Sequence, residues 1–412
     1  MPMELPLHGH KWAALRSEME AMRANDLDWK HGRHGAYVWY ANDELEEVLR
    51  EAFGMFLVEN GLGMRAFPSI ARMENEVLSM VRGLLGGDEE TAGIFTSGGT
   101  ESIFLAMFAL REWAQKEKRG VSRPEVVAPH SAHPALNKAA HMLGLAVKRV
   151  PVGADFRADP AAIKAAIGPN TVGLYASAPS YSLGMVDPIP ELGAIAAEQD
   201  LWFHVDACVG GILAPFVREC GRDVPPFDFT VPGVTSVSAD LHKSGFAAKP
   251  ASTVTFRTRA HREFSRYVFD DWPSGTYQSL TFTGTRPGGA IAASWAALNF
   301  LGREGYRELA ASSMRAKDRI IEGLTSIEGV HVHGEPPLYA FSWAAPGVDM
   351  GAVAGAMGKR GWMCGQTTSP SGIHVMATPV HEASADAYAA AAAESIAEAG
   401  AIGTPSQAAH YS

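Results

Sequence analysis

The sequence Ser236-Val-Ser-Ala-Asp-Leu-His-Lys243 decides how the rest of the chain is interpreted. Its first four residues are predicted to form a strand, which ends shortly before the pair His242-Lys243. In an open α/β sheet, ligands bind beyond the carboxyl ends of the strands. A lysine at that place could form a Schiff base with an aldehyde cofactor, and the plain alternative is a solvated surface lysine. The residues at the other strand ends decide between the two.

Short apolar runs and helical stretches alternate on both sides of this segment. Strands are predicted at 125–128, 146–150, 171–177, 202–205, 236–239 and 252–256. Helices are predicted at 74–85, 102–116, 134–143, 160–167 and 189–199. Strand, helix and strand at this spacing predict an α/β fold with a mostly parallel sheet covered on both faces.

The chain after Gly288-Gly289 has a different pattern. A long helix is predicted from Ala290 to about Gly323, with a break near 302–305. Short strands near 330–333, 339–343 and 373–377 then alternate with helices at 351–360 and 381–399, which is typical of a small α+β domain. We therefore expect an N-terminal segment at 1–60, a large domain at 61–288 and a small C-terminal domain at 289–412.

Composition and charge narrow the class of protein. The 412 residues are 47% hydrophobic and 19% charged, as in ordinary globular chains. The net charge of −10, without a long basic run, argues against nucleic-acid binding. Neither a signal peptide nor a membrane span is expected. The three cysteines are too few and scattered for disulfides or a zinc cluster, so we expect no metal site and a reduced, cytoplasmic setting.

Two further motifs place polar residues at strand ends. Asp206 ends the apolar run Phe203-His-Val-Asp. Its carboxylate could pair with a protonated pyridine nitrogen, and the equally good alternative is that it caps the next turn. His133 lies between a strand and a helix, where its ring could stack on a planar cofactor. A lone histidine is more often structural, and His130 is a competing candidate.

A third motif, Thr96-Ser-Gly-Gly-Thr-Glu101, precedes an apolar helix. Gly98 and Gly99 let the backbone approach a ligand, the helix N-terminus offers free N–H groups to an anion, and Thr100 adds a hydroxyl. The plain alternative is an ordinary helix start. Taken together, a phosphate cradle, a stacking ring, a carboxylate and an aldehyde-binding lysine predict a pyridoxal-phosphate site.

These motifs resemble the sphingosine phosphate lyase branch of the pyridoxal-phosphate-dependent group II decarboxylase superfamily. The resemblance covers roughly residues 35 to 310, and HVDAC, GVTSVSADLHK and the loop GTRPGG make it specific. The matching segments are TSGGTESIFLAM (96–107), HPALNKAAHMLG (133–144), DPIPELGAIA (187–196), LWFHVDACVGGIL (201–213), FDFTVPGVTSVSADLHKSGFAAKP (227–250) and TGTRPGGAIAASWAALNFLGREGY (283–306).

The resemblance implies an aspartate-aminotransferase-like fold, fold type I, and assigns roles to residues. Lys243 is then the lysine that holds the cofactor aldehyde, and Asp206 pairs with the pyridinium. Thr285 matches a position that reaches the cofactor phosphate from the neighbouring subunit, which implies a homodimer. The whole implied cofactor-binding set is Gly98, Gly99, Thr100, His133, Asp206, Ser238, His242, Lys243 and Thr285.

The substrate side departs from the resembled family. Its members commonly read Asn-Pro-Leu-His-Pro-Asp where this chain reads Asn60-Gly-Leu-Gly63-Met-Arg65, so Gly63 replaces a histidine expected to bind substrate phosphate. Upstream, Tyr37 lies one place from the family's tyrosine. Either Arg65 or Lys249 compensates, or the substrate carries no phosphate.

Tyr181 and Lys249 match positions near the substrate, with a loop aromatic and a surface charge as the plain alternatives. Either Tyr181 or His133 is expected to act as the acid or base, which makes Lys243, His133 and Tyr181 the predicted catalytic set.

The predicted function is a carbon–carbon lyase that cleaves a β-hydroxy amine by a retro-aldol step, with a substrate altered by the changed phosphate pocket. The first alternative is an L-amino-acid decarboxylase, for which Arg65 would bind the carboxylate. The cofactor motifs serve both reactions equally. A catalytically silent homologue is the second alternative, and the presence of Lys243, Asp206 and His133 together argues against it.

Overall fold

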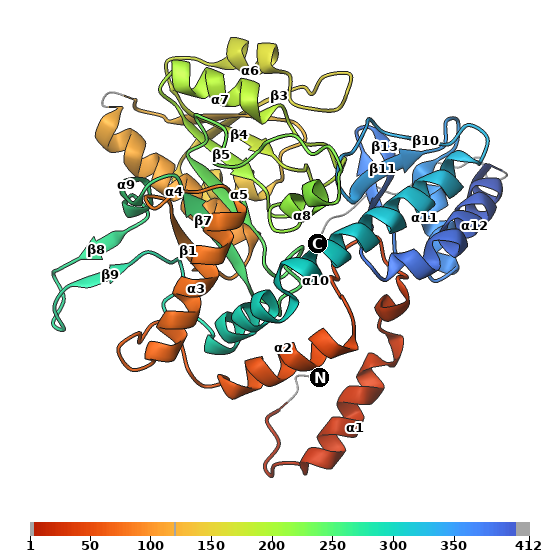
Figure 1. Ribbon diagram of the computed structural model, residues 1–412, viewed down its shortest axis with the longest axis horizontal. Helices are drawn as coiled ribbons and strands as arrows, with labels where there is room; N and C mark the ends of the chain where they lie inside the picture. Colours follow the sequence, from red (N-terminus) through yellow and green to blue (C-terminus); the bar gives the residue numbers. More distant parts are fainter. Residues whose placement is uncertain (1–3, 119–120, 401–412) are drawn as a thin grey trace.

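The computed structural model describes residues 4–118 and 121–400, and its largest element is a seven-stranded sheet in the order β1-β7-β6-β5-β4-β2-β3 (Figure 1). Its strands are β1 (Ala92–Thr96), β2 (Glu125–Pro129), β3 (Ala146–Val150), β4 (Thr171–Ser177), β5 (Trp202–Asp206), β6 (Ser236–Ala239) and β7 (Ser252–Phe256). Only β7 is antiparallel to its neighbours. The carboxyl ends of all the other strands therefore meet at one edge, which confirms the predicted mostly parallel α/β sheet.

Both faces of this sheet are buried under helices. These are α3 (Pro68–Leu84), α4 (Gly99–Glu117), α5 (Ala135–Leu143), α6 (Pro160–Ala166), α7 (Ile189–Glu198), α8 (Ala214–Glu219) and α9 (Arg259–Glu263). Side chains of β5 alternate between the two faces: Phe203 and Val205 belong to one apolar cluster, and Trp202 packs with α4 residues in the other. This double burial explains the continuous apolar runs of the sequence.

A second sheet, in the order β10-β11-β13-β12, is antiparallel and small. It consists of β10 (His331–Val332), β11 (Ala340–Ala344), β12 (Gly365–Thr368) and β13 (Ser371–Met376), packed with α11 (Met350–Lys359) and α12 (His381–Gly400). The long helix α10 (Gly288–Thr325) contacts α3 and α8 at one end and α12 at the other, and Gly302 breaks its helical geometry as the sequence predicts. The expected domain bounds remain a prediction.

The N-terminal part contacts the long helix α10 and the small sheet. Helix α1 (Trp12–Met22) has no buried residue and projects from the body (Figure 1), and short 3-10 turns η1 (Arg23–Asn25) and η2 (Trp29–His31) lead to helix α2 (Asp43–Met55) on α10. Between them, Gly35 hydrogen-bonds with the backbones of Met363 and Met376 and so joins the small sheet. None of the described helices is long and apolar enough to cross a membrane.

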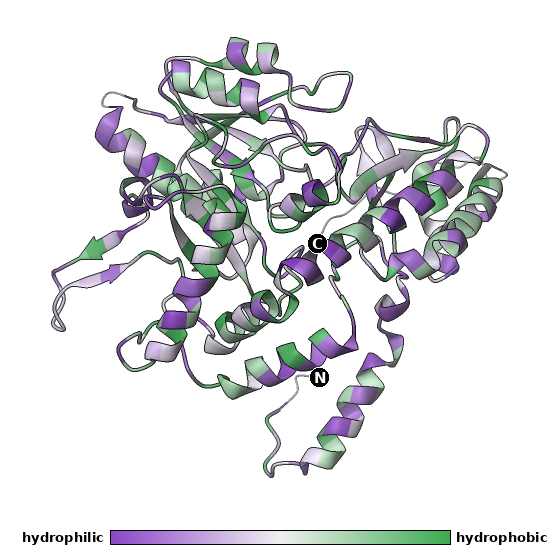
Figure 2. Cartoon of the chain, viewed as in Figure 1, coloured by the Kyte–Doolittle hydropathy of each residue, from purple (hydrophilic) through white to green (hydrophobic). Residues whose placement is uncertain are grey.

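A hairpin of β8 (Tyr267–Phe269) and β9 (Tyr277–Ser279) extends from the large sheet, and the sequence did not predict it. Figure 2 shows apolar residues along β8 on this projecting arm. Phe269 and Trp272 are 46% and 50% exposed. An exposed aromatic arm of this kind is typical of a contact surface.

Candidate active site

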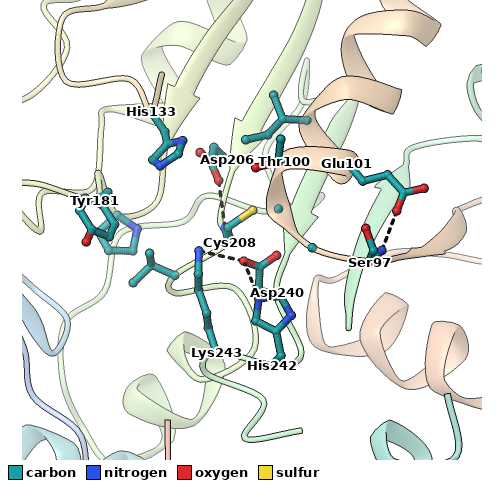
Figure 3. A pocket seen from close by; sticks show the side chains of 15 residues that line it. Ser97, Thr100, Glu101, His133, Tyr181, Asp206, Cys208, Asp240, His242 and Lys243 are labelled. Atoms are coloured by element: carbon teal, nitrogen blue, oxygen red, sulfur yellow. Dashed lines mark hydrogen bonds and ion pairs between the residues drawn. The ribbon is translucent and has the colours of Figure 1, made fainter. Parts of the chain in front are cut away.

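A cavity of about 350 Å³ lies at the edge where the parallel strands end (Figure 3). The structure brings eight of the predicted residues to its wall: Gly98, Gly99, Thr100, His133, Tyr181, Asp206, His242 and Lys243. The wall is completed by Ser97, Glu101, Ile103, Pro179, Cys208, Val209 and Asp240, which sequence reasoning did not single out. This placement follows from sheet topology, because each group follows a strand that ends at the same edge.

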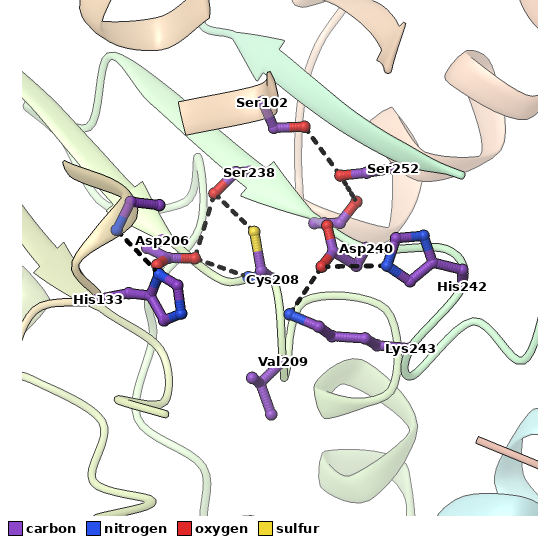
Figure 4. Close-up of polar contacts among 12 residues, drawn as sticks. Ser102, His133, Asp206, Cys208, Val209, Ser238, Asp240, His242, Lys243 and Ser252 are labelled. Atoms are coloured by element: carbon purple, nitrogen blue, oxygen red, sulfur yellow. Dashed lines mark hydrogen bonds and ion pairs between the residues drawn. The ribbon is translucent and has the colours of Figure 1, made fainter. Parts of the chain in front are cut away.

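Asp206 is held by donors from the two neighbouring strands, and Figure 4 shows the contacts with Ser238 and Cys208. The hydroxyl of Tyr175 on β4 donates to its carboxylate at 2.6 Å, and the backbone N–H of Cys208 and the hydroxyl of Ser238 on β6 donate at 3.1 and 3.3 Å. Burial would raise the pKa of Asp206, but the proximity of His133 and these hydrogen bonds outweigh it and lower that pKa. A fixed, ionised carboxylate is therefore available to keep a ring nitrogen protonated.

Ser238 thus acts on Asp206 from outside the cavity wall. Tyr175 is a site residue that sequence reasoning missed. On β4 it lies opposite His204 of β5, and its side chain is on the same face of the sheet as that of His204.

The amino end of α4 forms an anion cradle. Gly98 is its N-cap and supplies no side chain to the free N–H groups of the first turn. A Cβ on Gly99 would lie 2.7 Å from the Cys208 sulfur, and one on Gly98 would lie 3.3 Å from the His242 ring. Glycine is required here because the wall is already filled, and the open helix end suits a phosphate.

His242 completes this cradle. Its Nδ1 accepts the backbone N–H of Ala251 at 3.0 Å, so its Nε2 carries the proton of the neutral ring. Burial lowers the pKa of His242. Its ring is therefore available as a neutral donor beside Gly98.

His133 and Tyr181 lie on the opposite side of the cavity. The Nδ1 of His133 accepts the N–H of Ala135 at 3.1 Å, which leaves the proton on Nε2. Burial lowers the pKa of His133. Its ring contacts Tyr181 edge-on at 5.8 Å between centroids, and Tyr181 in turn packs on His374 of β13 at 4.5 Å. The small sheet therefore supports one wall of the cavity.

Lys243 is paired with a carboxylate that the sequence analysis did not consider. Its Nζ lies 2.8 Å from Oδ2 of Asp240, which is 1% exposed. Burial lowers the pKa of Lys243, but the charge of Asp240 outweighs it and the net pKa is raised. The turn that follows β6 joins the two residues, because the N–H of Lys243 bonds to the carbonyl of Asp240. An acid three residues before the lysine was the available signal.

Other predicted residues lie outside the cavity wall. Tyr37, Arg65 and Thr285 are exposed, and the Asn60 side chain accepts the backbone N–H groups of Leu62 and Gly63. Lys249 is also exposed and does not line the cavity, although burial and the charge of Lys243 lower its pKa. The substrate side of the predicted site is therefore not assembled around this cavity by one copy of the chain.

The segment before Thr285 is nevertheless fixed to the cradle. Glu101, buried in the first turn of α4, accepts the N–H groups of Ser97 at 2.7 Å and of Phe282 at 3.2 Å. The loop that carries Thr285 thus begins at the cavity edge and leaves it.

These residues fit pyridoxal phosphate. An uncapped helix start with two glycines and His242 would hold its phosphate, Asp206 its ring nitrogen, and Lys243 its aldehyde. The fold and the cavity therefore define a class: α/β enzymes that hold an aldehyde cofactor on a lysine at the carboxyl edge of the sheet.

Comparison with known proteins agrees with this class. The chain matches the pyridoxal-dependent decarboxylase conserved domain over residues 1–338. A sphingosine-1-phosphate lyase of Oryza sativa subsp. japonica is 37% identical over 386 residues, which cover 92% of this chain and 71% of that protein. A probable L-tyrosine/L-aspartate decarboxylase of Methanothermobacter thermautotrophicus is 34% identical over 76% of this chain and 85% of that protein.

Solved structures are similar throughout. The sphingosine-1-phosphate lyase of Burkholderia pseudomallei superposes with a TM-score of 0.93 at 35% identity, covering 97% of this chain and 94% of that one. Glutamate decarboxylase of Lactobacillus brevis gives 0.83 at 16% identity, over 98% and 96%, and shows the shared fold. The chain therefore belongs to the pyridoxal-dependent decarboxylase family. Within it, the chain is a pyridoxal-phosphate-dependent lyase homologous to sphingosine-1-phosphate lyases.

Proposed function

We propose that the protein is a carbon–carbon lyase that cleaves a β-hydroxy amine, of the sphingoid-base phosphate class or a related amino alcohol, by a retro-aldol reaction. The observation that carries the proposal is the cavity in which Lys243, Asp206 and His133 converge, in a chain that superposes on a sphingosine-1-phosphate lyase at a TM-score of 0.93. Pyridoxal phosphate, when bound, supplies the electron sink for this chemistry.

The residues of the chain divide the work. Lys243 holds the aldehyde, Asp206 keeps the ring nitrogen protonated, and the α4 cradle with His242 binds phosphate. His133 would stack on the ring of the bound cofactor, and its proton lies on Nε2 because Nδ1 accepts the N–H of Ala135. A base has to take the proton of the β-hydroxyl, and His133 and Tyr181 are the two candidates because both rings line the cavity on the same side.

The substrate end is proposed to differ from that of the relatives. Gly63 offers no side-chain donor, and the amide oxygen of Asn60 is used by its own turn. Arg65 and Lys249 are the two cations that the sequence offers in place of the histidine of the resembled family, and both are exposed. We assign Lys249 to the anionic end of the substrate, because it follows Lys243 by only six residues in the chain. The charge of Lys243 contributes, after burial, to the lowered pKa of Lys249, which agrees with this assignment.

The active enzyme is proposed to be a homodimer with shared active sites. The exposed loop that carries Thr285 leaves the cavity edge at Phe282, and the exposed β8–β9 hairpin lies just before it in the sequence. Both features are explained if a second copy covers the hairpin and receives Thr285 at its own cavity.

A product assay tests the reaction. The full chain loaded with pyridoxal phosphate is incubated with a sphingoid-base phosphate, with the unphosphorylated base, and separately with a panel of L-amino acids including tyrosine and aspartate. Mass spectrometry then looks for aldehyde, phosphoethanolamine, amines and carbon dioxide. Aldehyde with phosphoethanolamine is the expected result.

The amino-acid arm is included because the Methanothermobacter relative is described as a probable decarboxylase. Amine and carbon dioxide from an amino acid, with no aldehyde from either sphingoid base, would replace the proposal with a decarboxylase. Aldehyde from the unphosphorylated base alone would keep the lyase and remove the phosphate from its substrate.

A further inference from the structure

Three carboxylates line the cavity, and they have different partners. Glu101 accepts the backbone N–H groups of Ser97 and Phe282. Both oxygens of Asp206 accept hydrogen bonds, from Tyr175 on one side and from Cys208 and Ser238 on the other. Asp240, by contrast, has no hydrogen-bond donor in the part of the chain that the structure describes other than the two groups with which it forms ion pairs, Lys243 and His242. Its close partner is the ammonium of Lys243 at 2.8 Å (Figure 4).

The position of Asp240 makes it depend on that ammonium. The residue is 1% exposed, and the carboxylate forms part of the cradle wall, since a Cβ on Gly99 would lie 3.0 Å from Oδ2. An ionised carboxylate buried without a partner is strongly unfavourable. His242 is the next cationic candidate, but its Nε2 is 3.7 Å away and burial lowers its pKa.

We propose that Asp240 is a positioning residue that holds the Lys243 side chain as an ammonium whenever Nζ is not bonded to the cofactor aldehyde. It thereby sets how readily Lys243 exchanges with the substrate amine. The inference rests on the proposed function only through the use of an aldehyde cofactor, and it is independent of which Cα bond is later cleaved.

The exchange balances without an additional reactant. The C=N bond between the aldehyde carbon and Nζ breaks as a C=N bond to the substrate nitrogen forms. The three protons lost by the substrate ammonium are gained by Nζ, which leaves as an ammonium, and total charge is unchanged. Asp240 then binds the released ammonium of Lys243, with Nζ 2.8 Å from its carboxylate. Because the nitrogen stays protonated, it has no free electron pair with which to attack the new C=N bond.

Several groups from other elements also act on Lys243. Its surroundings contain Asp206 and Cys208 after β5, His133 before α5, His242 beside it and Lys249 further along. Asp206 is already satisfied by its own donors, and Lys249 repels the ammonium. Burial favours a neutral amine, so a raised pKa of Lys243 depends chiefly on Asp240.

Covalent capture of the cofactor tests this without any substrate. Full-length protein stripped of cofactor is mixed with saturating pyridoxal phosphate between about pH 6 and 11, and the absorbance of the bond to Lys243 is followed. Borohydride reduction and peptide mass spectrometry verify that Lys243 is the captured residue. In Asp240→Asn, the free amine fraction rises, so we expect capture about tenfold faster at neutral pH and a midpoint at least about one pH unit lower.

The difference between the two proteins should narrow as the pH rises, because the wild-type lysine loses its proton at a higher pH than the lysine of the variant. Asp228→Asn is the matched control, because Asp228 is a buried partner of Arg218 outside the cavity, and its capture profile should equal that of the wild type. An unchanged midpoint in Asp240→Asn would overturn the proposal, as would capture that is slower by the same factor at every pH.

The wild type alone decides the matter if Asp240→Asn does not fold. Its capture midpoint should lie above the ordinary lysine value of about 10.4, and a midpoint at or below that value contradicts the ion pair. Failure of the lyase assay with a normal capture profile would reject the proposed reaction and leave the role of Asp240 intact. Absence of any capture would reject both.

Discussion

The two sides of the candidate site are built in different ways. On the cofactor side, Asp206, Lys243 and His133 follow separate strands of one sheet and converge on one cavity, each with a defined partner. On the substrate side, Tyr37, Arg65 and Lys249 are exposed and lie outside the cavity wall. The difference shows that sheet topology alone creates the cofactor side, whereas the substrate side depends on segments outside the sheet.

This difference has a consequence for tolerance to change. A residue of the cofactor side is buried and hydrogen-bonded, so its substitution removes a partner that nothing nearby replaces. A residue of the substrate side lies in exposed chain, where substitution leaves the fold intact and changes only what is bound. The effects of substitutions should therefore be large and independent of substrate on the first side, and small and substrate-dependent on the second.

Replacing the cofactor-holding lysine should have the largest effect. Lys243→Ala removes the only group proposed to bond the aldehyde, so the absorbance of the bound cofactor should be lost and turnover should fall by at least about a thousandfold. Absorbance spectra and single-turnover kinetics measure the two. An unchanged spectrum would remove Lys243 from the mechanism, and the cofactor side would then have no covalent anchor.

Replacing Asp206 should have the second-largest effect on turnover. Replacing its hydrogen-bond donor Tyr175 should have a smaller effect of the same kind. Asp206→Asn abolishes the charge that faces the ring nitrogen, and we expect turnover to fall about a hundred- to a thousandfold. Tyr175→Phe removes one 2.6 Å hydrogen bond and keeps the carboxylate, so a loss of about tenfold is expected. Equal losses in the two variants would show that the site responds to packing and not to the charge of Asp206.

These residues also show what the sequence can and cannot predict. The strands at 146–150 and 171–177 were predicted with their observed bounds. A sheet that is buried on both faces requires apolar residues at successive positions, and such runs can be recognised in the sequence. Helix α3 was predicted to begin at Glu74 but begins at Pro68, because proline suits the first helical turn.

Asp240, Tyr175 and Glu101 escaped prediction for a different reason. Their roles depend on the turn after β6, on the register of β4 against β5, and on a contact with Phe282 that is 181 residues away in the chain. The contacts of Tyr175 and Glu101 leave no local period or spacing in a sequence, whereas Asp240 left one signal, its position three residues before Lys243. The β8–β9 hairpin escaped prediction because its strands are short and exposed, so no buried face produces a regular apolar pattern in the sequence.

The exposed β8–β9 hairpin is proposed to hold the second copy whose Thr285 completes the site. Changing the hairpin should therefore lower turnover by an intermediate amount. Phe269→Glu with Trp272→Glu places charges on exposed positions, so folding of one chain should be unaffected. If a second copy covers this surface, light scattering should show a shift from dimer to monomer. Loss of Thr285 from the shared site should then lower turnover on the order of ten- to a hundredfold. Lys116→Glu, an exposed change on α4, is the control and should keep the wild-type mass. A dimer of unchanged mass and activity would contradict the proposed contact.

The smallest effect is expected on the substrate side, and it should be a gain. At Gly63 a Cβ would meet Phe67 and Ala66 no closer than 3.7 Å, so a side chain fits without displacing the turn that Asn60 caps. Gly63→His would restore the donor that the resembled family has, and one hydrogen bond to a phosphate should raise kcat/KM for a phosphorylated amino alcohol about two- to tenfold. Gly63→Ala separates the donor from the loss of glycine's freedom and should give no gain. A gain equal for phosphorylated and unphosphorylated substrates would mean that position 63 acts on the fold of the turn and not on the substrate phosphate.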